Sequence, residues 1–198
     1  MNSDVMNKII LTATMAVLVV LEFFALGVDS HFKYDFICLV ILLFVIYGLR
    51  KKLFLHWAHF LLFCIFLVVH DWGVFGAYQW YPMGMEYDYW VHGFFGVIAS
   101  MIILRALRLC KFNLSTKTRV LLVITITLGL SAAHELYEFA GAILLGEGEG
   151  VLFIGAGDLD EWDTQKDMLN NLIGAVLGLV FYGGITRIFR KPDAQWSL

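Results

Sequence analysis

The chain has 198 residues, of which 60% are hydrophobic and only 16% charged, and its mean hydropathy is +0.77. Soluble domains carry roughly 25% charged residues and expose few large apolar patches, so this composition excludes a water-soluble globular protein. The net charge of −3, without a basic stripe interleaved with aromatic residues, also excludes nucleic-acid binding. We therefore expect an all-α, polytopic membrane bundle.

Six apolar segments approach the length of about twenty residues that crosses a bilayer. The first contains Glu22 and exceeds the apolar run of a signal peptide, so we interpret it as a retained helix. We expect one integral membrane domain over residues 1–198. The predicted transmembrane helices cover about 9–28, 34–50, 53–71, 88–107, 119–145 and 167–187.

Lysine and arginine residues predict how the helices are oriented. They gather in 50–52, in 105–119 and after residue 186, which are the connections after the second and fourth segments and the tail after the sixth. Because cytoplasmic loops are enriched in these residues, we expect both termini to be cytoplasmic. The connection 72–87 then faces outward, and its tryptophan and tyrosine residues suit either an interfacial belt or a lid over a site.

Ionisable side chains interrupt the apolar segments, almost all in the predicted outer halves. Such residues are costly within a membrane and mark functional sites by default. Asp88 and His92 are spaced i,i+4, as are Asp163 and Asp167, so each pair shares one helix face. The residues expected to form the site are Glu22, Asp88, His92, His134, Glu135, Glu138, Asp163, Asp167 and the amide residue Asn171. His70 and Asp71 close the third segment on the same side of the membrane, and His70 is a further candidate.

Small residues lie next to these polar stripes. A small-xxx-small pattern lets membrane helices approach closely, so we expect the last three helices to bring their polar faces together. The glycines concerned are Gly93, Gly96, Gly141, Gly174 and Gly178.

Several carboxylates gathered in one place repel one another unless they are protonated or a cation neutralises them. A mixed set of carboxylate and imidazole ligands favours Zn²⁺, Mn²⁺ or Fe²⁺ over Mg²⁺ or Ca²⁺ as the divalent metal cofactor. The expected ligands are His92, Glu138, Asp163 and Asp167. Asp88 or Glu135 is the expected general base. Asn171, His134 and Glu22 are expected to orient or support the ligands.

Three motifs carry a family resemblance. They are YDYWVH (87–92), ELYE (135–138) and DEWDTQKDM (160–168). The second half of the chain resembles the YjdF-like bacterial inner-membrane proteins and, more distantly, the VanZ-like superfamily. The resemblance implies a multi-pass protein of the bacterial inner membrane and supports the importance of these polar residues. It does not name a reaction.

Three functions fit this pattern. One is a metal-dependent hydrolase or transferase that acts on a lipid or lipid-linked envelope substrate at the outer membrane face. No GxSxG motif is present, which disfavours a serine nucleophile. The alternatives are a non-catalytic membrane protein with a structural polar or metal cluster, and an ion-coupled transporter, since intramembrane carboxylates also line ion pathways.

Overall fold

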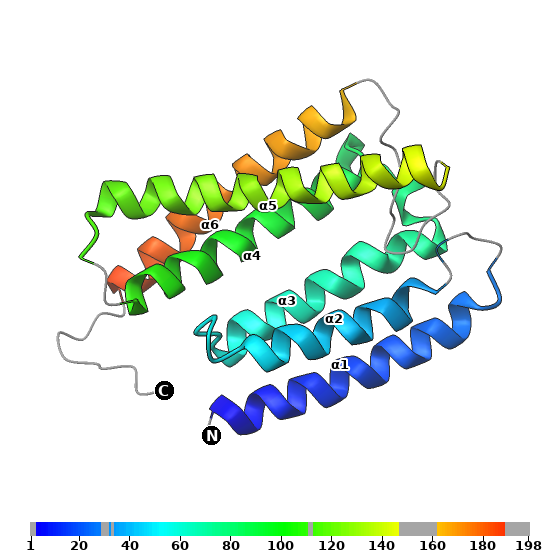
Figure 1. The fold of residues 1–198 in the computed structure, drawn as a ribbon, viewed down its shortest axis with the longest axis horizontal. Helices are drawn as coiled ribbons and strands as arrows, with labels where there is room; N and C mark the ends of the chain where they lie inside the picture. Colours follow the sequence, from blue (N-terminus) through cyan, green and yellow to red (C-terminus); the bar gives the residue numbers. More distant parts are fainter. Residues whose placement is uncertain (1–2, 29–31, 33, 111–112, 147–161, 189–198) are drawn as a thin grey trace.

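The computed structural model describes residues 3–28, 32, 34–110, 113–146 and 162–188 (Figure 1). Within these residues the regular secondary structure is entirely helical, so the predicted all-α fold is confirmed. The α-helices are α1 (Ser3–Ala25), α2 (Asp35–Leu49), α3 (Trp57–Asp71), α4 (Tyr87–Leu109), α5 (Thr116–Leu144) and α6 (Asp163–Ile188). Three short 3₁₀ helices, η1 (Trp72–Phe75), η2 (Ala77–Gln79) and η3 (Pro82–Gly84), connect α3 to α4.

The lengths of the helices match a membrane protein. Among the described residues, α1, α4, α5 and the stretch Trp57–Phe75 are long and apolar enough to cross a bilayer. The 15 residues of α2 span about 22 Å, less than the hydrocarbon core of about 30 Å. The 29 residues of α5 span about 43 Å, so this helix must tilt or leave the hydrocarbon layer at an end.

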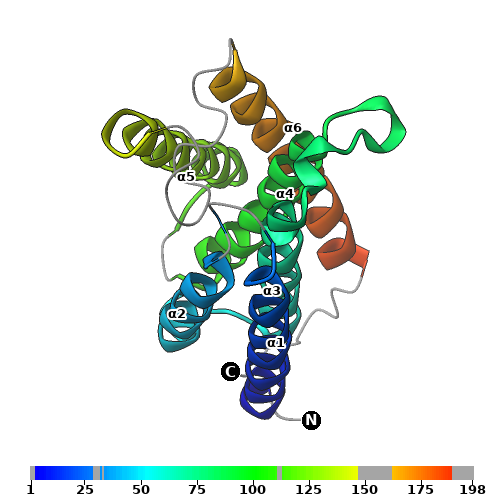
Figure 2. The same cartoon turned by 90° about the vertical axis from the view of Figure 1, so that its right-hand side faces the viewer.

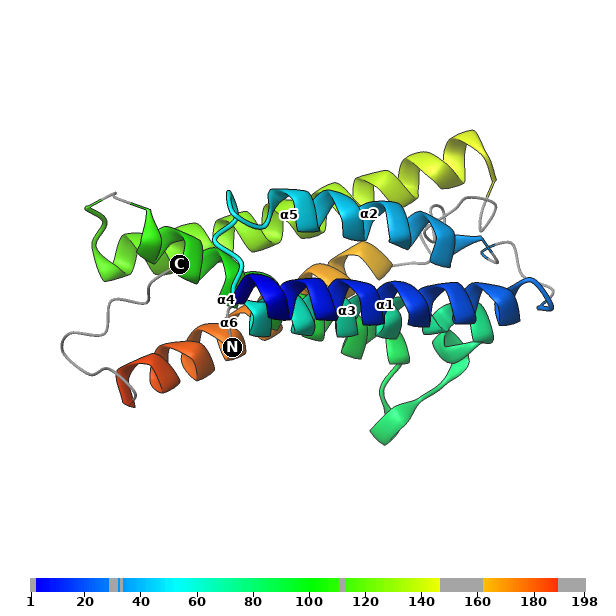
Figure 3. The ribbon, with the colours of Figure 1, turned by 90° about the horizontal axis from the view of Figure 1, so that it is seen from below.

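Successive helices run back and forth along the long axis of the molecule (Figure 1). The start of α1, the connection from α2 to α3, the start of α5 and the end of α6 lie at one end of the bundle. Figures 1 and 2 show α1, α2 and α3 as one group and α4, α5 and α6 as a second group beside it. Seen from below in Figure 3, the two groups overlap, with α1 in front. The cytoplasmic location of both termini stays a prediction.

The first group is held together by an apolar core. Its fully buried side chains come from all three helices, as the packing of a helix group with one apolar interior requires. The largest of them are Leu18 of α1, Phe36 and Leu43 of α2, and Phe60 of α3.

The second group depends on close approach between the backbones of α4 and α6. A Cβ atom added to Gly174 would collide with the carbonyl group of Gly93, and one added to Gly96 would collide with the carbonyl oxygen of Asn171. At Gly178 the added atom would meet the hydroxyl oxygen of Ser100. The predicted glycine contact is therefore present, and it sets the polar faces of α4 and α6 side by side.

The connection from α3 to α4 has an outer and an inner surface. Trp80, Tyr81 and Met83 are exposed, which agrees with an interfacial belt. Tyr78 instead turns inward, and its hydroxyl group donates a hydrogen bond to the carbonyl oxygen of His70 at 3.3 Å. Asp160 and Glu161 of the DEWDTQKDM motif lie outside the described residues.

Candidate functional site

The site begins on the first two turns of α4. Asp88 is in the first turn, and His92 lies one turn deeper on the same face. The Nε2 atom of His92 is 3.5 Å from Oδ1 of Asp88. His92 is only 8% exposed because α6 covers it.

The corresponding face of α6 supplies Asp167 and Asn171. Asp167 is buried, and its Oδ2 atom lies 3.7 Å from Nε2 of His92. One possible ligand atom each from Asp88, His92 and Asp167 falls within 4.8 Å of the others. Of the groups that the described residues form, this is the one compact enough to hold a single metal ion, and we call it the Asp–His–Asp group.

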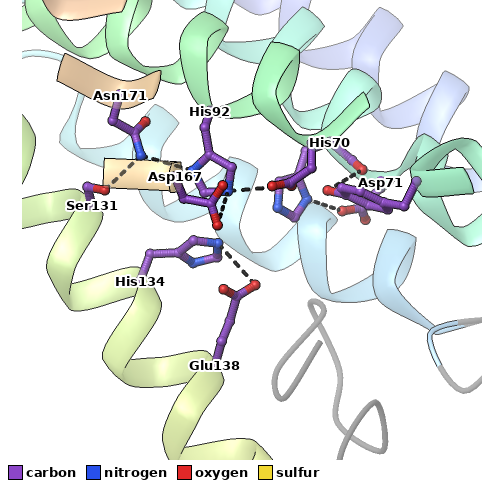
Figure 4. A network of polar contacts seen from close by, with 10 residues as sticks. His70, Asp71, His92, Ser131, His134, Glu138, Asp167 and Asn171 are labelled. Carbon is purple, nitrogen blue, oxygen red and sulfur yellow. Dashed lines mark hydrogen bonds and ion pairs between the residues drawn. The ribbon is translucent and has the colours of Figure 1, made fainter. Parts of the chain in front are cut away.

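Asn171 connects three helices beneath this group. Its side-chain nitrogen donates a hydrogen bond to the hydroxyl oxygen of Ser131 in α5 at 2.7 Å and lies 2.9 Å from Nδ1 of His92. All three side chains are buried. Asn171 therefore contacts the imidazole ring at Nδ1, whereas the two carboxylates lie near Nε2 (Figure 4). Its supporting role for a ligand stays a prediction.

The inner face of α5 places His134 and Glu138 one turn apart. The Nε2 atom of His134 is 3.3 Å from Oε1 of Glu138. The rings of His134 and His92 have centroids 6.1 Å apart, so this pair lies next to the Asp–His–Asp group. Glu135 is also buried, 3% exposed, and lies within electrostatic range of Asp167.

The end of α3 adds His70 and Asp71, which the sequence places at the depth of the site without giving them a role there. His70 Nδ1 lies 2.9 Å from Oδ1 of Asp71, and the His70 ring is 5.9 Å from that of His134 between centroids. A histidine followed by aspartate at the end of an apolar segment is the only signal that the sequence contains for this pair.

Tyr78 was also missed, because nothing in the sequence distinguishes it from the other aromatic residues of its connection. Burial, followed by the charges of Asp88 and Glu138, raises the pKa of its phenol well above the ordinary value. Tyr78 therefore lies within electrostatic range of both Asp88 and Glu138.

The remaining predicted residues lie at the edge of the site or away from it. Asp163 is half-buried in the first turn of α6, within electrostatic range of Asp167. Glu22 is buried in α1 and lies near Cys38 together with Asp35 and Asp71, so it belongs to the first helix group. In the part of the chain that the structure describes, neither Glu138 nor Asp163 joins the Asp–His–Asp group, whereas Asp88 does.

Comparison with known proteins identifies the family. The family model described as "Predicted membrane protein (DUF2238)" matches residues 7–187. "Inner membrane protein YjdF" of Escherichia coli (strain K12) is 29% identical over 116 residues. The match covers 53% of this chain and 54% of that relative, and so spans about half of its length. No solved structure matches the chain.

These matches confirm the resemblance to YjdF-like proteins, while the more distant VanZ-like resemblance stays a prediction. The long apolar helices agree with both matches, since they are able to cross a bilayer. The chain is an integral protein of the inner membrane and belongs to the DUF2238 family of predicted membrane proteins.

Proposed function

We propose that this protein is a metal-dependent hydrolase or transferase that acts on a lipid or lipid-linked substrate of the cell envelope. The observation that carries the proposal is the meeting of Asp88, His92 and Asp167, from two helices, within 4.8 Å of one another. Two carboxylates and one imidazole match the ligand chemistry of Zn²⁺, Mn²⁺ or Fe²⁺.

The surrounding atoms fit a bound cation. The Oδ1 atom of Asp167 is buried and has no hydrogen-bond partner among the described residues. Buried polar atoms are almost always paired, so an unpaired carboxylate oxygen beside two other ligand groups supports a cation there. Desolvated carboxylates in a membrane protein are neutralised either by protonation or by a cation, because burial disfavours their charged form.

His92 must present a lone pair to the cation. With the side-chain nitrogen of Asn171 facing Nδ1, the neutral ring carries its proton on Nε2. A half-turn of the amide group brings its oxygen to Nδ1, moves the ring proton there, and frees Nε2 for the metal. Ser131 can then donate its hydroxyl proton to the same oxygen. The Oδ1 atom of Asn171, which lacks a partner among the described residues, gains two in this arrangement.

A metal bound here would polarise a phosphoryl or acyl oxygen and lower the pKa of a water molecule. Glu135, buried and within electrostatic range of Asp167, accepts the proton of the attacking water. The water oxygen forms a bond to the phosphorus or acyl carbon as the ester bond breaks. The departing oxygen takes the proton from Glu135, which restores the carboxylate.

The test compares the full-length wild type with Asp167→Asn in detergent. Elemental analysis measures bound metal, thermal unfolding measures stability, and mass spectrometry measures head-group release from vesicles of bacterial polar lipids. We expect metal and metal-dependent release only in the wild type, with both proteins folded. Glu86→Gln, which changes a carboxylate next to α4 but outside the group, is the control. A wild type without metal contradicts the proposal.

A structural role for the same cluster is the second candidate. The contacts that Asn171 makes to Ser131 and near His92 tie α4, α5 and α6 together, which is what a stabilising cluster would do. In that case Asp167→Asn loses both the metal and the folded state, and vesicle lipids remain unchanged with the wild type. The same two measurements therefore separate the two candidates.

A further inference from the structure

We propose that the end of the bundle opposite the Asp–His–Asp group binds the phosphodiester head group of an anionic membrane lipid. Arg105 lies about 20 Å beyond His92 along α4, so this site is separate from the proposed metal site and does not depend on it. The residues concerned, which we call the basic–aromatic cluster, are Phe54, His56, His59, Arg105, Arg108 and Tyr182.

The basic–aromatic cluster lies where the two helix groups meet. Figure 1 shows the start of α3, the end of α4 and the end of α6 at the same end of the bundle. The first three residues of the cluster come from the start of α3 and the connection before it, and the other three come from α4 and α6. The ends of membrane helices lie at the depth of the lipid head groups, so a head group can reach this cluster from the bilayer.

The guanidinium group of Arg105 is the first support. Its Nε atom donates a hydrogen bond to the carbonyl oxygen of Phe54 at 2.8 Å, which fixes the group beside the connection from α2 to α3. This bond uses one of its five N–H donors. Among the described residues the other four have no partner, and no carboxylate lies within ion-pair distance. A fixed positive charge with unused donors at the membrane interface favours a phosphate group as ligand.

The distribution of acidic residues explains why the positive charge is not balanced. Residues 36–70, 89–134 and 168–192 contain no aspartate or glutamate. Among the described residues at this end of the bundle, the acidic one is Asp4. Its carboxylate oxygens lie 2.7 Å from a guanidinium nitrogen of Arg50 and 3.6 Å from the ammonium nitrogen of Lys8. An anion from outside the chain is therefore needed to neutralise Arg105, and anionic lipids supply it at this depth.

His59 gives the second, independent support. It is only 6% exposed, and neither ring nitrogen has a hydrogen-bond partner among the described residues. Buried polar atoms are almost always paired, so these nitrogens indicate a missing ligand. The rings of His59 and Tyr182 meet edge to face with their centroids 5.3 Å apart, and His59 lies within electrostatic range of Arg105. A phosphate oxygen between Arg105 and Tyr182 accepts the ring N–H of His59.

Arg108 covers the same aromatic ring from the outside. Its guanidinium carbon lies 5.6 Å from the centre of the Tyr182 ring, in a cation–π contact. Because the residue is exposed, its long side chain can move away from Tyr182 and admit the head group to His59. The same guanidinium group then pairs with the lipid phosphate.

The experiment measures lipid binding to the full-length protein in detergent. Phosphatidylglycerol, phosphatidylethanolamine or inorganic phosphate is added, native mass spectrometry gives the Kd, and thermal unfolding gives the stabilisation. We expect phosphatidylglycerol alone to bind and to raise the Tm. Arg105→Gln and His59→Leu should each raise its Kd by about tenfold. Lys117→Gln, which removes an exposed charge at the same end but outside the cluster, should bind like the wild type.

Size-exclusion chromatography and circular dichroism confirm that each variant is folded. A wild type that binds phosphatidylglycerol and phosphatidylethanolamine equally well overturns the proposal, whether or not any variant folds. Binding of inorganic phosphate without binding of lipid also overturns it. Equal Kd values for Arg105→Gln and Lys117→Gln would mean that the lipid follows the overall charge of this end, and they overturn the cluster as its site. Metal binding at the Asp–His–Asp group is unaffected by each of these outcomes.

Discussion

The side-chain nitrogen of Asn171 lies 2.9 Å from Nδ1 of His92, across the interface between α6 and α4. This contact decides which nitrogen of His92 carries the ring proton, and therefore whether Nε2 can bind a cation. Both residues are buried, so water does not take the place of the amide group.

The first prediction concerns this contact. Asn171→Asp supplies a permanent acceptor for the Nδ1 proton, so we expect it to keep metal bound. Asn171→Leu removes the acceptor, and we expect metal affinity to fall by about 10- to 100-fold, as for other residues that orient ligands. Competition with a metal indicator measures both constants. Equal affinities for the two variants would show that Asn171 does not orient His92.

The second prediction concerns the glycine contact. Gly174→Ala places a methyl group against the carbonyl of Gly93, so α4 and α6 must separate. We expect a loss of about 1–3 kcal/mol in unfolding free energy and weaker metal binding. Gly184→Ala is the matched control on α6, because its Cβ atom has nothing within 4 Å. Thermal unfolding in detergent compares them, and similar curves would contradict the close contact.

The third prediction concerns the proposed general base. Glu135→Gln removes the proton acceptor but none of the three atoms of the Asp–His–Asp group. We expect metal content to stay at the wild-type level and the rate of head-group release to fall by about 10²- to 10⁴-fold. Metal analysis and the vesicle assay are run on the same preparation. Unchanged turnover would remove Glu135 from the reaction.

The fourth prediction is a pH dependence set by Tyr78. Its pKa in the folded protein is raised above the ordinary value of 10, mainly by burial, so the folded state holds a proton that the unfolded state releases. The associated stability is present below pH 10 and is lost as the pH rises above it. In Tyr78→Phe, the free energy of unfolding should therefore fall less steeply with pH above pH 10 than in the wild type. Tyr81→Phe, at an exposed position, serves as the control and should leave the wild-type slope unchanged.

The fifth prediction concerns orientation. If the basic connections are cytoplasmic, Met83→Cys reacts with a membrane-impermeant maleimide added outside spheroplasts, and Lys52→Cys reacts only after permeabilisation. Both positions are exposed, so access depends on the side of the membrane. The background is a cysteine-free version of the full chain, since Cys38, Cys64 and Cys110 are present. The reverse labelling pattern would invert the predicted topology.

Part of the site follows from local rules that the sequence obeys. The i,i+4 spacing placed Asp88 with His92, and the apolar segments showed where the helices lie. The lysine- and arginine-rich connections showed on which side of the membrane the polar residues lie. Gly174 and Gly178 marked a close contact between helices. These features depend on residues near one another in the chain, where periodicity is informative.

The pairing of distant elements could not be read in the same way. Whether Asp88 or Glu138 joins His92 and Asp167 depends on how α5 is rotated against α4, and no local pattern encodes that rotation. His70 entered the site through the packing of α3 on α4, and Tyr78 through the path of a connection. Glu22 shares the depth of the site but faces the first helix group. Depth alone therefore does not predict contact.

The seam between α4 and α6 has a consequence for how a lipid reaches the metal-binding residues. Where Gly174 meets Gly93 and Gly96 meets Asn171, backbone touches backbone and no side chain remains that could swing aside. An acyl tail cannot enter from the bilayer between α4 and α6 without separating the two helices. A lipid would instead enter along α5. The inward groups there are side chains such as His134 and Glu138, which can rotate out of the way.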